Sequence, residues 1–204
     1  MIIIWVLALV TAITIHEAAH AWMADKLGDP TARIMGRLSL NPLVHYDTVG
    51  TTILLVSSLM RALGAPIIPF GWAKPVEFDP YNLKNPKKDS ALISFAGPLS
   101  NILLSVVLSI IMHLSPSLVI FLLPFVVLNI SLAIFNLIPI HPLDGGKILV
   151  GLLPNKESYE VDRFLHRFGT ILLIFLILPS VGGNSLVSII ISPVVNTILA
   201  LLIP

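Results

Sequence analysis

Long apolar segments alternate with short polar ones along most of this chain. Four segments are long and apolar enough to cross a bilayer as helices, and they cover residues 2–24, 90–113, 118–138 and 185–204. A fifth segment, 164–180, is shorter but has the same character. The pattern therefore predicts an all-α polytopic membrane protein.

One further segment, 48–63, is shorter and richer in Thr and Ser. The chain has 12 Lys and Arg residues in all, and the turns near 114–117 and 179–184 contain none of them. If 48–63 enters and leaves on the same side, every basic residue lies on one side of the membrane, as the positive-inside rule requires. We therefore interpret 48–63 as a re-entrant or interfacial helix, and we expect the basic loops on the cytoplasmic side of the cell (plasma) membrane.

Composition agrees with this picture, since 56% of the 204 residues are hydrophobic and only 11% are charged. An ordinary soluble domain is excluded, and the net charge of +1 argues against a nucleic-acid partner, which requires a basic surface. The chain has no cysteine, so any metal site must use histidine and carboxylate ligands.

No insertion between the apolar segments is large enough to form a separate folded domain. We treat 1–204 as one integral membrane domain, with a core over about 1–150 and further helices over about 160–204. Between 66 and 88 the chain is dense in Pro and Gly and has short β-type runs. This composition predicts a small membrane-associated β-containing region within 25–85, on the basic side.

The first apolar segment contains the sequence HEAAH, with His16, Glu17 and His20. Ionisable residues inside a membrane span are costly and are candidates for function. His16 and His20 are four residues apart on a helix, so both imidazoles can bind one metal ion, and zinc suits two nitrogens, a third protein ligand and one open position. Glu17 is then placed to act as a general base toward a water molecule.

A carboxylate for the third ligand position is supplied by the sequence NLIPIHPLDGG. Pro139 and Pro142 prevent a regular helix there, and the two glycines permit a tight turn, so Asp144 can be directed back toward the histidines. The alternative is that Asp144 only caps or turns the chain at the membrane interface.

Four motifs together now resemble a known family. HEAAH, GWAKPV followed by NPKKD, AGPLSN, and NLIPIHPLDGGKIL occur in this order between about residues 14 and 150. They are similar to the site-2 protease family of intramembrane zinc metalloproteases. Only a short turn near 115–117 lies where one class of that family carries a PDZ domain, so the resemblance is to the short form without that domain.

The resemblance implies one Zn²⁺ ion per chain, with His16, His20 and Asp144 as ligands and Glu17 as the general base. It also implies that Asn136 helps to hold the substrate backbone or the oxyanion, a role for which a side-chain amide is suited. The implied activity is regulated intramembrane proteolysis of a single-pass transmembrane protein in the lipid bilayer, in or near its transmembrane segment. The implied fold is a three-helix catalytic core of 2–24, 90–113 and 118–138 with two further transmembrane helices.

Possible substrate-binding residues precede the second span. Gly71, Trp72 and Lys74 belong to a loop that in this family is thought to approach the cleft, where an extended substrate could add a strand to an exposed edge. His45 lies in LNPLVHYDTVG, which resembles a family segment but lacks its proline after Asp47. An active-site contact by His45 therefore competes with a role as a loop histidine.

The remaining histidines and polar residues receive smaller roles. His141 lies between prolines next to Asp144, where support of the ligands or modulation by pH is one reading, and His113 and His166 are most simply interfacial. Asn101 and Asn129 lie within spans and are expected to hydrogen-bond between helices.

Two rival functions remain. A metal transporter could use the same three ligands, but it would not need Glu17 as an uncommitted base and would need ligands along a path through both leaflets, and the sequence shows no second ligand cluster. A catalytically silent scaffold would not need the full catalytic set. The donor set favours zinc over other divalent ions without excluding them.

Overall fold

The computed structural model describes residues 2–64, 71–181 and 184–204, and this part of the chain is almost entirely helical. Its α-helices are α1 (Ile2–Leu27), α2 (Thr31–Ile34), α3 (Gly50–Ala62), α4 (Pro86–Leu114), α5 (Val119–Asn136), α6 (Asp144–Leu152), α7 (Asn155–Ile177) and α8 (Leu186–Leu202). Short 3-10 turns cover Pro42–His45, Pro80–Asn82 and Pro116–Leu118. The strands β1 (Pro179–Val181) and β2 (Asn184–Ser185) form an antiparallel pair.

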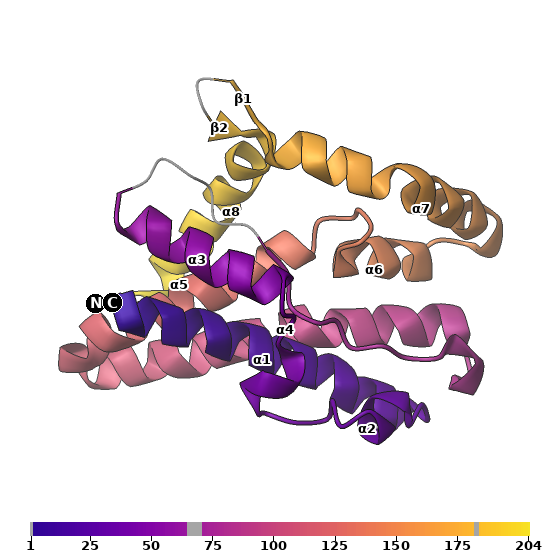
Figure 1. Ribbon diagram of the computed structural model, residues 1–204, viewed down its shortest axis with the longest axis horizontal. Coiled ribbons are helices and arrows are strands. Elements are labelled where there is room, and N and C mark those ends of the chain that lie inside the picture. Colours follow the sequence, from indigo (N-terminus) through magenta and orange to yellow (C-terminus); the bar gives the residue numbers. More distant parts are fainter. Residues whose placement is uncertain (1, 65–70, 182–183) are drawn as a thin grey trace.

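The predicted three-helix core is confirmed. Figure 1 shows α1, α4 and α5 running side by side along the long axis, and each of the three packs on the other two. In the part of the chain that the structure describes, α1, α4 and the helical stretch Pro116–Asn136 are long and apolar enough to cross a membrane. The chain is therefore an all-α integral membrane protein.

Buried polar groups join the core helices. The Asn101 side-chain amide on α4 donates to the Ala12 carbonyl of α1 at 2.9 Å and to Asn129 Oδ1 of α5 at 2.7 Å. All three residues are fully buried. The expected hydrogen bonding of Asn101 and Asn129 between helices is thus confirmed, and it fixes the three helices in register where no water can replace these bonds.

The later helices lie against this core. Figure 1 places α6 between α4 and α7, and both pairs are in contact, while α8 packs mainly on α5. α7 begins with a charged stretch, and α8 has 17 residues, shorter than the core spans. Whether α7 and α8 cross the membrane stays a prediction.

α3 has 13 residues and so rises about 20 Å. This is less than the hydrocarbon thickness of about 30 Å, which agrees with the prediction that segment 48–63 does not cross the membrane.

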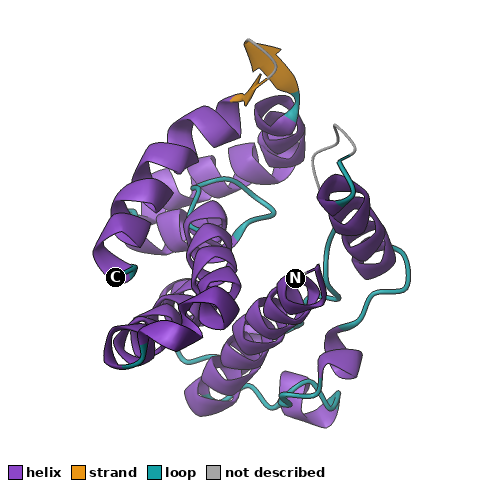
Figure 2. Cartoon of the chain, turned by 90° about the vertical axis from the view of Figure 1, so that its left-hand side faces the viewer, coloured by secondary structure: helices purple, strands orange, loops and turns teal. Residues whose placement is uncertain are grey.

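The β-containing part of the prediction is wrong for the described residues. Within 25–64 and 71–85 there are helices, turns and extended chain but no strand, and the short ladder of β1 and β2 instead lies at one edge of the molecule (Figure 2). Pro75 lacks a backbone N–H, and the neighbouring N–H groups of Lys74 and Val76 donate to the His45 carbonyl and to the Glu17 side chain. Those donors are therefore not available for a ladder.

A buried carboxylate ties the end of α1 to the start of α4. Asp29 is fully buried and accepts hydrogen bonds from the Thr31 backbone and hydroxyl, the Asp79 backbone N–H and the Asn82 amide at 2.5–3.1 Å. Burial alone would raise the pKa of Asp29, but these hydrogen bonds outweigh it and hold the pKa below its ordinary value. This junction ties α1, which carries His16 and His20, to the segment that leads into α4, the helix against which both imidazoles lie.

Candidate metal centre

Two helices bring three metal-ligating side chains together. His16 and His20 are buried on one face of α1, and Asp144 is the first residue of α6. Asp144 Oδ2 lies 3.0 Å from His16 Nε2 and 3.3 Å from His20 Nε2. Donor atoms that share one tetrahedral zinc ion at about 2.0–2.1 Å are about 3.3 Å apart. The three side chains therefore already have the separations that a zinc ion requires.

The Nδ1 atoms of both imidazoles, which lie on the ring side away from Asp144, make hydrogen bonds. His16 Nδ1 lies 2.7 Å from Asn101 Oδ1, and His20 Nδ1 lies 2.7 Å from the Ile93 carbonyl. The Asn101 amide nitrogen already donates to its two helix partners, so its oxygen faces His16 and can only accept. Each histidine must then carry its proton on Nδ1, which leaves the Nε2 lone pair for a metal. This is the protonation state that zinc binding needs.

Glycines make the space for this arrangement. A Cβ on Gly97 of α4 would lie 2.5 Å from His20 Nε2 and 2.8 Å from His16 Cε1, closer than any real Cβ contact. A Cβ on Gly145 would meet the backbone carbonyls of Leu137 and Ile138. Gly97 thus allows the imidazoles to lie against α4, and Gly145 allows α6 to start close to the end of α5.

Glu17 and Asn136 line the same small cavity, which has a volume of about 140 Å³. Glu17 Oε2 accepts a hydrogen bond of 3.0 Å from the Val76 backbone N–H. One N–H of the Asn136 amide donates to the Leu132 carbonyl at 3.1 Å, and the second N–H of such an amide is a further donor. A carboxylate and an amide donor therefore lie beside the three candidate ligands.

The possible substrate-binding residues lie elsewhere. His45 is buried, its Nε2 contacts the Ser39 carbonyl at 2.9 Å, and it lines a separate, mostly apolar cavity of about 250 Å³. The exposed Trp72 packs against Gly50, and a Cβ on Gly71 would meet the backbone of α3. The Lys74 backbone N–H donates to the His45 carbonyl at 2.9 Å. The structure does not bring these four residues to the metal centre, and their substrate contacts stay predictions.

Some functional candidates were not identified from the sequence. Asn101 was expected to join helices, but its contact with His16 was not foreseen, and neither was the close approach of Gly97 to the two imidazoles. Lys147 also lines the cavity, and burial holds its pKa below the ordinary value against the opposing charges of Asp144 and Glu17. A signal for Lys147 was present, because it lies one helical turn after Asp144 in LDGGKIL.

Two imidazoles and a carboxylate converge inside a helical membrane protein, with a second carboxylate in the same cavity, and this is the set of side chains that a metal-dependent hydrolase requires. Over residues 4–121 and 115–176 the sequence matches the model of peptidase family M50. The chain belongs to this family, which confirms the resemblance to the site-2 proteases, and it is accordingly a zinc metalloprotease with Zn²⁺ as its cofactor.

Curated relatives agree with this assignment. The chain is 35% identical over 199 residues to "Putative zinc metalloprotease YwhC" of Bacillus subtilis (strain 168), covering 88% of this chain and 86% of that protein. It is 30% identical over 146 residues to "Stage IV sporulation protein FB" of the same organism, covering 72% of this chain and 50% of the relative. "Zinc metalloprotease MJ0392" of Methanocaldococcus jannaschii is 25% identical over 156 residues, covering 74% of this chain and 34% of that protein. No solved structure matches.

Proposed function

We propose that this metalloprotease hydrolyses a peptide bond in or near the transmembrane segment of a single-pass membrane protein, as a step of regulated intramembrane proteolysis. The observation that carries the proposal is the position of the candidate site. His16, Glu17 and His20 lie on α1, a helix long and apolar enough to cross a membrane. We place the enzyme in the cell (plasma) membrane, and the distribution of Lys and Arg supports an orientation with its basic loops in the cytoplasm.

In this proposal His16, His20 and Asp144 hold the zinc ion. When bound, zinc supplies Lewis acidity at the site. Glu17 takes a proton from the attacking water and returns it to the leaving amine, and the Val76 N–H orients the Glu17 carboxylate for both transfers. The free N–H of Asn136 donates to the oxyanion that develops on the attacked carbonyl.

The size of the cavity supports cleavage of an unwound substrate. A volume of about 140 Å³ cannot admit an intact helix, which is about 10 Å in diameter with its side chains. The cavity shares Pro75, Val76, Phe78 and Lys147 with a neighbouring cavity of about 750 Å³. A locally extended segment could lie in the larger cavity, along the extended chain near Val76, and present one peptide bond to the metal centre.

The transporter alternative needs a new comparison, because the structure does contain a second ligand cluster. His141, Asp162 and His166 lie together among the described residues, so the sequence-based statement that no such cluster exists was wrong. A path through both leaflets does not follow, since His141 is only three residues from Asp144 and is therefore close to the first cluster. Glu17 also belongs to neither ligand set, as expected of a base and not of a transport path.

The test compares cleavage of a single-pass transmembrane reporter by purified protein in detergent. The samples are the unmodified protein, the same protein with a zinc chelator, Glu17→Gln, and Glu160→Gln as a matched control on the exposed face of α7. We expect chelator and Glu17→Gln each to lower the rate by about 100-fold or more, with zinc still bound to the Glu17→Gln protein. Full cleavage by Glu17→Gln would contradict the proposal, and bound zinc with no cleavage of any reporter but zinc flux in liposomes would favour transport.

A further inference from the structure

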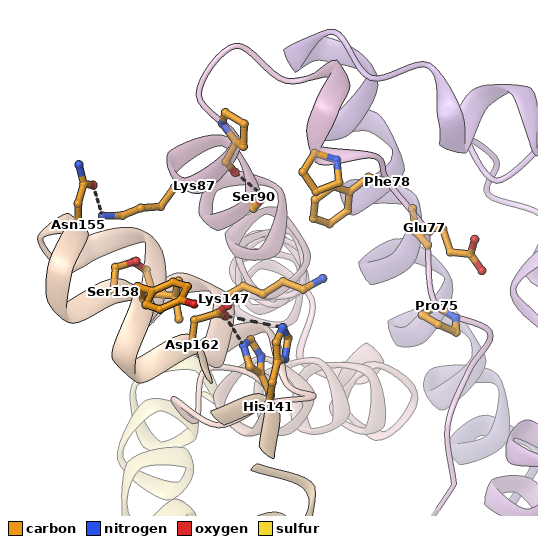
Figure 3. A pocket seen from close by; sticks show the side chains of 16 residues that line it. Pro75, Glu77, Phe78, Lys87, Ser90, His141, Lys147, Asn155, Ser158 and Asp162 are labelled. Carbon is orange, nitrogen blue, oxygen red and sulfur yellow. Dashed lines mark hydrogen bonds and ion pairs between the residues drawn. The ribbon is translucent and has the colours of Figure 1, made fainter. Parts of the chain in front are cut away.

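A second group of metal-ligating side chains lies in the wall of the larger cavity. His141 precedes α6, and Asp162 and His166 are four residues apart on α7. Figure 3 shows Asp162 directed toward His141, with dashed contacts from its carboxylate to two imidazole rings. Asp162 Oδ1 lies 3.2 Å from His141 Nε2 and 3.8 Å from His166 Nε2. One oxygen thus faces the Nε2 atoms of two histidines.

The two imidazoles are arranged side by side. Their ring centroids are 4.5 Å apart and the ring planes differ by 23°. All three donor atoms lie within 4.8 Å of one another. The separations of 3.2 and 3.8 Å bracket the value of about 3.3 Å for donors on one tetrahedral zinc ion. The His166 side chain is 67% exposed and is the ligand that must move closer to Asp162 to complete the set.

The cluster depends on a close approach between the backbone of α7 and the loop before α6. A Cβ on Gly169 of α7 would meet the His141 carbonyl oxygen, so only glycine lets α7 lie this close to the loop before α6. A Cβ on Gly146 would lie 2.6 Å from His141 Nδ1. His141 is consequently confined and buried, with 6% of its surface exposed, and it cannot turn away from α7.

The cluster opens to solvent, because 67% of the His166 side chain and 40% of the Asp162 side chain are exposed, which gives an ion a path of entry.

We propose that His141, Asp162 and His166 form a second divalent transition-metal site, with Zn²⁺ as the best match to two imidazoles and one carboxylate. An ion here joins α7 to the loop that leads into Asp144, three residues after His141. The site is therefore structural: it holds in place the segment that delivers the third ligand of the catalytic centre. The one carboxylate of the cluster, Asp162, is a ligand in this proposal, so the cluster itself supplies no separate base and is not assigned a hydrolytic role.

The test counts zinc ions on the full chain. Protein with a histidine-free affinity tag is stripped with a chelator and dialysed to equilibrium against Zn²⁺ buffered in the micromolar range, and bound zinc is measured per chain. We expect two ions on the unmodified protein and one on His166→Gln. His113→Gln, a second exposed histidine, is the matched control and keeps two. His16→Gln/His20→Gln retains one ion, that of the second site.

Either of two results overturns the proposal: one ion on the unmodified protein, or two ions on His166→Gln. His166 is largely exposed, so its substitution does not threaten folding, and Asp162→Asn provides an independent variant with the same expected count. The zinc count uses no substrate, so a count that contradicts the second site does not affect the proteolysis proposal. In the same way, a reporter that is not cleaved does not affect the zinc count.

Discussion

The two histidine–carboxylate clusters have the same ligand types in opposite settings. In the cluster of His16, His20 and Asp144, two histidines four residues apart on α1 meet a carboxylate from another element, and both histidines are buried. In the cluster of His141, Asp162 and His166, a carboxylate and a histidine four residues apart on α7 meet a histidine from another element. Asp162 is half-buried and His166 is exposed.

The difference teaches what a catalytic site needs beyond ligands. In the first cluster, His16 Nδ1 hydrogen-bonds to Asn101 and His20 Nδ1 to the Ile93 carbonyl. Glu17 and Asn136, the proposed base and oxyanion donor, line the same cavity. The second cluster has suitable donor distances, but among the described residues its two imidazoles have polar contacts only with Asp162, one of the ligands themselves. The first arrangement is preorganised for chemistry, whereas the second is suited to holding two segments together.

The largest effect is expected from removing the space for the first cluster. In Gly97→Ala, the new methyl group displaces the imidazoles of His16 and His20. A displacement of about 1 Å costs about 100-fold in rate. Bound zinc should fall from two ions to one while the second cluster keeps its ion. Reporter cleavage and zinc content are measured together, and Gly97→Ala with normal activity would remove the spatial argument.

A smaller effect is expected from removing the hydrogen bond between Asn101 and His16. Asn101→Leu leaves His16 Nδ1 without its acceptor, and loss of such a partner lowers metal affinity by about 10–100-fold. Zinc affinity is measured by competition with a chromophoric chelator, and helix content by circular dichroism. Ser105→Ala, buried one turn later on α4, is the control that should keep its affinity, and equal losses in both variants would point to general destabilisation.

Asp29 provides a third comparison, a buried carboxylate that is held by hydrogen bonds alone. Its pKa is lower folded than unfolded, so its contribution to stability is present above the ordinary value of 3.8 and is lost as pH falls below it. Asp29→Ala should cost about 2 kcal/mol at neutral pH, with a smaller difference from the unmodified protein at pH below 3.8. Chemical unfolding in detergent at several pH values checks this, and a pH-independent difference would contradict it.

The smallest effect on catalysis is expected from the second cluster. His166→Gln loses one ion but keeps Glu17, Asn136 and the three catalytic ligands, so the cleavage rate should fall by no more than about fivefold, equivalent to about 1 kcal/mol. Rates are compared at equal occupancy of the first cluster. A loss as large as that of Glu17→Gln would mean that the second cluster takes part in chemistry.

Much of this architecture could be predicted from the sequence because it depends on local patterns. Apolar length predicted the core spans, helical spacing paired His16 with His20, and the breakers around Asp144 predicted a carboxylate directed back toward them. The partners of those residues could not be predicted in the same way. The contact of Asn101 with His16 joins α4 to α1 across 85 positions, and nothing in the local sequence chooses that acceptor.

The second cluster and the missing β structure illustrate the same limit. His166 was expected to be interfacial, because its pairing with His141 depends on Gly169 bringing α7 against a distant loop. The short β-type runs near Val76 predicted strands, but the N–H groups there are used by Glu17 and His45. In both cases a tertiary contact, and not the local preference, decided the structure.

The central claim is that the cluster of His16, His20 and Asp144 performs the chemistry. The most direct test adds Zn²⁺ stepwise to chelator-stripped protein and follows bound zinc and reporter cleavage in the same samples. Our account predicts that cleavage reaches nearly its full rate with the first ion per chain, bound at the cluster of His16, His20 and Asp144, and rises only slightly with the second. Cleavage that appears only as the second ion binds, or that persists in His16→Gln/His20→Gln, would contradict it.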